Sequence, residues 1–155
     1  SNYFSAVVLC HSLEHIPIPM ETLTEIYRIM SPRGLLIIDV PNSNCADAIF
    51  FKTAWYALVF PHHIFHWTSR SLTHALRRTG FTIDHFRYKI PKYSDYVVNY
   101  RNSRSQPAAI NASIPQLLFH ILKVWTIGRT VKRRSQYGHY ISCYAIKKDG
   151  CSNSL

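Results

Sequence analysis

Six side chains of the sequence could carry out proton transfer or bind a metal ion. Most of them follow directly on the short apolar run of residues 4–10. Their thiol, hydroxyl, carboxylate and imidazole groups are the types that enzymes use as general acids, bases and ligands, and imidazole changes charge near neutral pH. We therefore take as candidate site residues Cys10, His11, Ser12, Glu14, His15 and His63.

The composition excludes several other kinds of site. The five glycines stand far apart, so no G-x-G-x-x-G or P-loop cradle for a nucleotide phosphate is present in the chain. The cysteines form no C-x-x-C pair, which excludes a zinc site built on paired cysteines and a disulfide scaffold. They are Cys10, Cys45, Cys143 and Cys151.

Hydropathy and charge bear on location and partners. No uninterrupted apolar run reaches the about 18 residues of a membrane span, and we expect a cytoplasmic protein. The formal net charge is +10, and all of it comes from residues 87–155, because acids and bases cancel in residues 1–86. The basic part is either a solvated face or a surface for an anionic partner, such as lipid headgroups, nucleic acid or a phosphorylated substrate.

The first part of the chain predicts a βαβ unit that would position the site. Residues 4–10 form a short, apolar, β-branched run typical of a buried parallel strand. Apolar residues then recur at helical spacing from Leu23 to Met30, and Pro32 and Gly34 end that helix. Residues 35–40 predict a second buried strand. The candidate residues after the first strand would thus lie at the carboxyl edge of a parallel sheet.

The rest of the chain predicts further elements and an insertion. Thr68 or Ser69 caps a helix that ends at Gly80. Residues 46–60 predict a helix that serves as core, lid or surface anchor, and residues 61–67 predict a loop. Strands are predicted over 81–88 and 140–147. Between them lies an insertion over about 91–138, with a loop at 91–107 and a helix at 114–127, and residues 149–155 form a polar tail. We interpret four further histidines as loop or surface residues: His62, His66, His74 and His85.

Three segments resemble the class I S-adenosylmethionine-dependent methyltransferases, in particular their broad group of small-molecule enzymes. Phe4-Ser-Ala-Val-Val-Leu-Cys-His-Ser-Leu-Glu-His15 is similar to the family's fourth strand and its Leu-Glu-His signature. Tyr27-Arg-Ile-Met-Ser-Pro-Arg-Gly-Leu35 resembles the turn into the fifth strand, with Arg33 in place of the first of two glycines. His63-Ile-Phe-His-Trp-Thr68 through Gly80-Phe81 resembles the segment leading into the sixth strand.

The resemblance implies a fold and a place within it. The expected fold class is α/β, the C-terminal half of a Rossmann-like methyltransferase sheet, with strands four to seven, the last antiparallel, and helical insertions. Residues 1–148 would form a partial methyltransferase domain. The family's glycine-rich loop and ribose-binding acid have no counterpart in these residues. The chain is therefore expected to work with a missing N-terminal half of the domain, and by itself to be inactive.

The resemblance also implies roles for the candidate residues. Cys10, His11 and Ser12, after the fourth strand, would line the S-adenosylmethionine site. Glu14, His15 and His63 are the expected catalytic residues, since some relatives, the ubiquinone-pathway and small-RNA methyltransferases, bind a divalent metal through matching positions.

Two arrangements of this catalytic trio are open. In one, Glu14, His15 and His63 ligate a metal, and the nitrogen ligands suit a transition metal better than Mg²⁺. In the other, which we favour, Glu14 and His15 form a hydrogen-bonded pair at the helix entry and His63 is a base of the substrate loop.

Two functions remain as alternatives at this point. The first is methyl transfer to a small, hydrophobic acceptor at oxygen or carbon. The second is a non-catalytic remnant or binding module whose basic half contacts membrane or RNA. A nucleic-acid partner is less favoured than a membrane or a small molecule. The tyrosines beside the basic residues could stack on bases, but they could equally well pack in the core. A peripheral contact with an anionic membrane is suggested by the apolar stretches 46–60 and 114–127, the second followed by Arg129 and residues 132–134.

Overall fold

The computed structural model describes residues 2–89, 98, 99, 101, 102, 122, 126, 129 and 135–148. Three predicted segments fall wholly or largely outside the described residues. They are the loop at 91–107, the helix at 114–127 and the tail at 149–155. The account below concerns the described residues alone.

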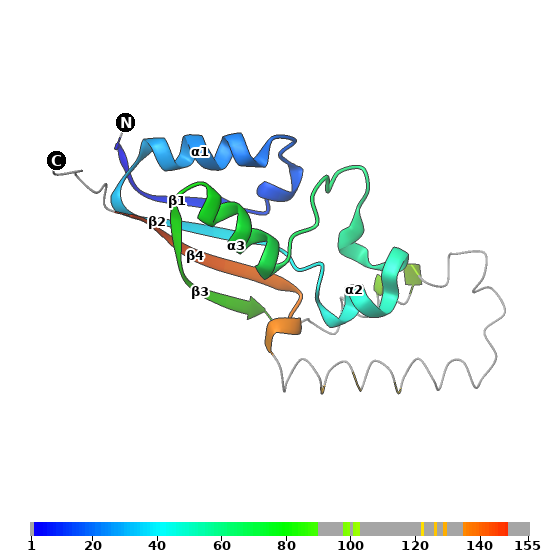
Figure 1. Cartoon of the computed structure of the whole chain (residues 1–155). Coiled ribbons are helices and arrows are strands. Elements are labelled where there is room, and N and C mark those ends of the chain that lie inside the picture. Colours follow the sequence, from blue (N-terminus) through cyan, green and yellow to red (C-terminus); the bar gives the residue numbers. More distant parts are fainter. Residues whose placement is uncertain are drawn as a thin grey trace.

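Four strands form one sheet in the order β1-β2-β4-β3. They are β1 (Phe4–Cys10), β2 (Met30–Pro41), β3 (Phe81–Lys89) and β4 (Tyr140–Lys147). β1 pairs with β2 in parallel, and β4 lies between β2 and β3, antiparallel to both (Figure 1). The predicted α/β class and the antiparallel last strand are confirmed.

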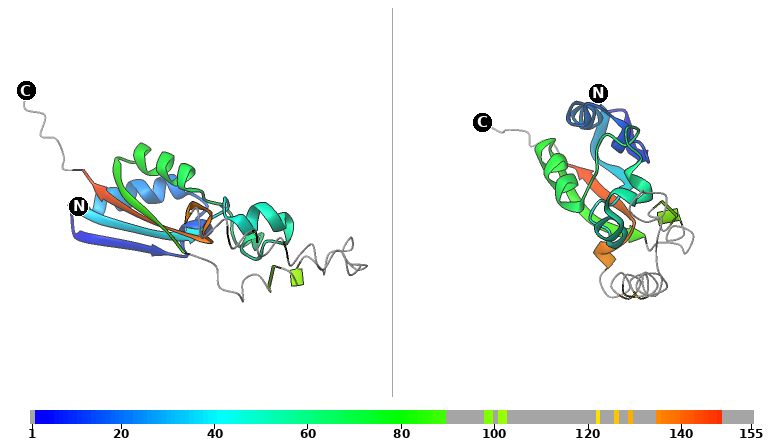
Figure 2. Two further views of the ribbon diagram at one scale, coloured as in Figure 1. Left: turned by 90° about the horizontal axis from the view of Figure 1, so that it is seen from below. Right: turned by 90° about the vertical axis from the view of Figure 1, so that its right-hand side faces the viewer.

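The helices α1 (Pro19–Ile29) and α3 (Ser69–Arg78) cover one face of this sheet, as Figure 2 shows. Leu23 of α1 and Leu72 of α3 are fully buried against the face of β2 that carries Leu36 and Ile38. Thr68 caps α3 through a reciprocal capping box with Ser71, as its residue type predicts. The main core therefore lies on this side.

The second face of the sheet carries apolar side chains without a helix among the described residues. Val8 of β1 is 59% exposed and Ile146 of β4 is 37% exposed. β1 is also an edge strand in the described sheet, with only β2 beside it. Parallel sheets are normally covered on both faces, and among the described residues this face of the sheet is open.

The end of the first helix differs from the prediction, and the turn that follows is strained. The first helix ends at Ile29 and not at Pro32, because Met30 is already extended and pairs with Phe4 of β1. Arg33, in the position of the family's glycine, adopts a φ of 62° in the left-handed region. A side chain there is strained relative to glycine.

The predicted helix over 46–60 is wrong as a single helix. The segment contains α2 (Ala46–Phe51) and the 3₁₀ turns Lys52–Ala54 and Tyr56–Leu58. Trp55 between the turns is extended, and the backbone N–H of Tyr56 donates to the side chain of Asn99 at 2.7 Å. The buried apolar residues of this segment pack together in a small core of their own, made of Cys45, Phe51, Ala54, Trp55 and Ala57.

Candidate functional site

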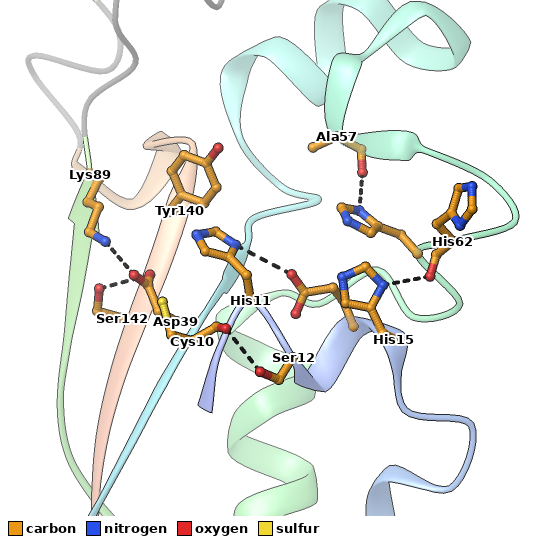
Figure 3. A network of polar contacts seen from close by, with 12 residues as sticks. Cys10, His11, Ser12, His15, Asp39, Ala57, His62, Lys89, Tyr140 and Ser142 are labelled. Atoms are coloured by element: carbon orange, nitrogen blue, oxygen red, sulfur yellow. Dashed lines mark hydrogen bonds and ion pairs between the residues drawn. The ribbon is translucent and has the colours of Figure 1, made fainter. Parts of the chain in front are cut away.

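The candidate residues gather at the carboxyl edge of the sheet. Cys10 ends β1 and pairs in register with Asp39 of β2. Lys89 ends β3 and lies opposite Tyr140, where the antiparallel β4 begins. All four strands therefore present side chains to one edge, where ligands of open α/β sheets bind (Figure 3).

Glu14 is the buried carboxylate of this edge. It lies in a 3₁₀ turn (Leu13–His15) directly after β1, and its side chain is only 1% exposed. Neither carboxylate oxygen has a hydrogen-bond partner among the described residues, although His11 Nδ1 lies 3.4 Å from Oε1. Buried carboxylates are costly unless they are paired, so this one is suited to an incoming cation or proton donor.

The backbone of Glu14 holds the loop that carries His63. Its carbonyl accepts hydrogen bonds from the N–H groups of Ile64 at 2.8 Å and Phe65 at 3.1 Å. This clamp fixes a loop from beyond β2 onto the turn that follows β1. It explains how two segments distant in sequence share one site.

The structure brings Glu14, His15 and His63 together. One ligand atom of each lies within 4.8 Å of the others, and the two imidazole rings are 4.8 Å apart between centroids. His15 Nδ1 contacts the carbonyl of His62 at 2.8 Å, and His63 Nδ1 contacts the carbonyl of Ala57 at 2.7 Å (Figure 3). Because a carbonyl only accepts, Nδ1 carries the hydrogen in both rings and Nε2 keeps its lone pair.

The predicted hydrogen bond between Glu14 and His15 is wrong. The Nδ1 of His15 points to the His62 carbonyl, and the carboxylate of Glu14 has no hydrogen-bond partner among the described residues. The 3₁₀ turn places consecutive side chains on different sides, so neighbours in sequence do not pair here.

A second group of polar side chains adjoins the first. Ligand atoms of Cys10, His11 and Asp39 lie within 4.8 Å of one another. Asp39 accepts a hydrogen bond from Ser142 Oγ at 3.2 Å and forms an ion pair with Lys89. The hydrogen bond that Lys89 Nζ donates to Asp39 raises the pKa of Lys89.

Sequence reasoning missed a buried polar cluster beneath this edge. His139 Nε2 lies 2.7 Å from Asp47 Oδ2, and the two side chains are 1% and 0% exposed. Asn99 Nδ2 donates to the same oxygen at 2.6 Å. The hydroxyl of Tyr56 donates to that of Tyr140 at 2.6 Å. The one sequence signal was Asp47 as the only acid in an otherwise apolar stretch.

The three described cysteines differ in chemistry. Burial raises the pKa of Cys45 and of Cys143 to about 12, so both remain thiols near neutral pH. Cys10 is exposed at the carboxyl edge. Of the described thiols, it is the one positioned for chemistry.

A family comparison identifies the domain. The model described as "Methyltransferase domain" matches residues 1–85, more than half of the chain. The chain belongs to this methyltransferase family. The match includes β1, the Glu14–His15 turn, β2 and the His63 loop, so the resemblance seen in the sequence is confirmed. No curated protein matches this methyltransferase domain in sequence.

Solved structures share the fold of the methyltransferase domain. A methyltransferase from Thermotoga maritima has a TM-score of 0.58 and 13% identity over 95% of this chain and 57% of its own. A methyltransferase from Archaeoglobus fulgidus has a TM-score of 0.56 and 19% identity, and the match covers 94% of this chain and 60% of that protein. The [4+2]-cyclase SpnF has a TM-score of 0.53 and 18% identity, and the match covers 96% of this chain and 51% of the cyclase. The domain thus spans between half and two thirds of these proteins.

The residues present fit S-adenosylmethionine in part. The end of β1 offers Cys10, His11 and Ser12 to a ligand, although the Ser12 hydroxyl donates to the Cys10 carbonyl at 2.9 Å. The buried Glu14 beside them suits a cationic cofactor. The chain has no glycine-rich loop to hold the rest of it.

Proposed function

We propose that this domain forms the acceptor side of an S-adenosylmethionine-dependent methyl-transfer site. The acceptor would be a small, hydrophobic molecule methylated at oxygen or carbon. The observation that carries the proposal is the convergence of Glu14, His15 and His63 at the carboxyl edge of a methyltransferase sheet. Cys10, His11 and Ser12 would line the cofactor, whose sulfonium supplies an already activated methyl group.

The histidines supply the proton acceptor in this proposal. Nδ1–H of His15 and of His63 is tied to a backbone carbonyl, which fixes each ring and leaves Nε2 as the basic atom. A base held in this way can take the proton from an acceptor hydroxyl as the methyl group is transferred. The carboxylate of Glu14 would stabilise the imidazolium that forms.

The same trio is also chemically suited to hold a divalent transition metal. Two imidazoles and one carboxylate are a ligand set of such ions. Histidine ligands usually donate their second ring N–H to a carbonyl or a carboxylate, as His15 and His63 do here. A metal there would bind and orient the acceptor oxygen, and the histidines would then be ligands and no longer bases.

Exposed apolar side chains support a hydrophobic acceptor. Phe60 is 82% exposed and Ile64 is 48% exposed, and both flank His63 in the sequence. Val59 is 43% exposed in the same loop. These exposed side chains form an apolar segment adjacent in sequence to the proposed base.

The first test concerns cofactor affinity. We expect the 155-residue chain to bind S-adenosylmethionine only weakly, with Kd well above the micromolar range, because it has no glycine-rich loop. Isothermal titration calorimetry measures this directly. Submicromolar binding would show that these residues form a complete cofactor site and would overturn the idea of a partial domain.

A peripheral membrane contact is a second candidate, favoured by the exposure of Phe60. No helix in the described part of the chain is long and apolar enough to cross a membrane. In liposome co-sedimentation, we expect Phe60→Ser to weaken binding about tenfold or more, since burying such a ring is worth about 1.5–3 kcal/mol. Tyr3→Ser, a change at another exposed ring, is the control.

The lipid dependence decides this candidate. Binding should be stronger with anionic lipid and weaker in high salt if the basic part of the chain contributes. If Phe60→Ser and Tyr3→Ser bind liposomes equally, or if neither they nor the parent chain bind, the loop around Phe60 serves the acceptor alone.

A further inference from the structure

We propose that Cys10, His11 and Asp39 form a binding site for a zinc-like transition-metal ion, with Glu14 as the partner that orients His11. This site is separate in its ligands from the Glu14, His15 and His63 trio. It rests on side-chain placement alone. Because Cys10 and His11 are also proposed to line the cofactor, an ion here would compete with the cofactor for this edge.

The sheet itself brings two of the ligands together. Cys10 and Asp39 are register partners on the parallel strands β1 and β2, so their side chains stand next to each other on one face. His11 follows at once, with a φ of 48° in the left-handed region. Ligand atoms of the three residues lie within 4.8 Å of one another, a span that one ion can bridge.

The buried carboxylate of Glu14 provides independent support. His11 Nδ1 lies 3.4 Å from Glu14 Oε1, and both oxygens of Glu14 have no hydrogen-bond partner in the described part of the chain. Since Nδ1 is the ring nitrogen beside the carboxylate, Nε2 is the one left for a metal. Carboxylate–histidine–metal triads are the usual arrangement around such ions, and they raise the basicity of the ligand.

Asp39 is already oriented for ligation. Its Oδ1 accepts from Ser142 Oγ at 3.2 Å, and its other oxygen pairs with Lys89. Each carboxylate oxygen has two lone pairs, so one remains for an ion. Lys89 opposes the ion by its charge. Its side chain is 56% exposed and can swing into solvent when the ion binds.

The ligand chemistry selects the class of metal. Thiolate, imidazole and carboxylate together suit Zn²⁺ and Co²⁺ and are unsuited to Mg²⁺ and Ca²⁺, which prefer oxygen. Three protein ligands leave one position of a tetrahedral ion open to water. On binding, Cys10 gives up its thiol proton to the solvent, so affinity should increase with pH.

Cobalt spectroscopy tests this site specifically. Adding Co²⁺ to the chain, in a Cys151→Ser background that removes the cysteine of the undescribed tail, should produce a thiolate-to-cobalt charge-transfer band. Cys10→Ser should abolish the band. Cys45→Ser is the matched control and should retain it, because Cys45 is a buried thiol with a raised pKa.

Three further variants separate the possible outcomes. Glu14→Gln should lower Co²⁺ affinity about 10–100-fold while the band remains, and Lys89→Gln should increase affinity. His15→Gln should leave the band unchanged, because His15 belongs to the other group. The proposal is overturned if no band forms, or if the band survives Cys10→Ser. Circular dichroism confirms that each variant is folded.

Discussion

Replacing His63 by glutamine is expected to lower kcat for methyl transfer by a factor of about 10² to 10⁴ in the active enzyme. That is the usual contribution of a positioned general base. Glutamine can keep a hydrogen bond to the Ala57 carbonyl but has no basic atom to replace Nε2. His15→Gln should give a loss of similar size if the two rings act together. The measurement is the rate of S-adenosylhomocysteine formation at saturating cofactor.

The control for these variants is His74→Gln. His74 is exposed on α3, away from the carboxyl edge. KM for the acceptor should change much less than kcat, because the base acts in the transition state. An enzyme that keeps full activity with both His15 and His63 replaced would refute their role. If activity also requires a metal and dialysis against a chelator abolishes it, the two histidines are ligands and not bases.

Replacing Asp47 by alanine is expected to destabilise the domain by about 3–5 kcal/mol, the usual cost of removing a buried carboxylate from the side chains that pair with it. The change leaves His139 and Asn99 without their shared oxygen inside the protein. It also removes the contact between Asp47 of α2 and His139, the residue just before β4. Urea denaturation followed by circular dichroism measures the loss.

Asp84→Ala is the matched control for the Asp47 variant. Asp84 also pairs with a histidine, His85, at 2.7 Å, but its side chain is 54% exposed. Exposed pairs contribute less than about 1 kcal/mol, so this variant should remain close to the parent protein. Equal effects of the two substitutions would mean that the buried pair contributes no more to stability than the exposed pair, and would contradict the prediction.

The strands were predictable because their sequence pattern is local. The β-branched and apolar runs ending at Cys10 and at Lys147 mark strands wherever they occur, and the capping residue Thr68 marks the start of α3. The start of β2 was not predictable, because Met30 fits the apolar stripe of α1 equally well. Only its pairing with Phe4 of β1 decides between helix and strand.

The segment 46–60 shows what local patterns leave out. Its composition favours a helix, yet a contact with Asn99 and the burial of Asp47 break it into shorter pieces. The same holds for the site. The motif led to Glu14, His15 and His63, but the direction of each Nδ1–H depends on carbonyls that the fold supplies. His139 gives no sequence signal of its partner, because Asp47 is distant along the chain.

We propose the carboxyl edge around Cys10 and His15 as the methyl-transfer site. The most direct measurement is a nuclear magnetic resonance titration of the isotope-labelled chain with S-adenosylmethionine at millimolar concentration, at which even weak binding is visible. We expect amide shift changes concentrated at Cys10, His11 and Ser12, with little change at Leu23 of α1 or at Phe81, where β3 begins. Shift changes confined to other parts of the sheet, or none at saturating concentration, would contradict it.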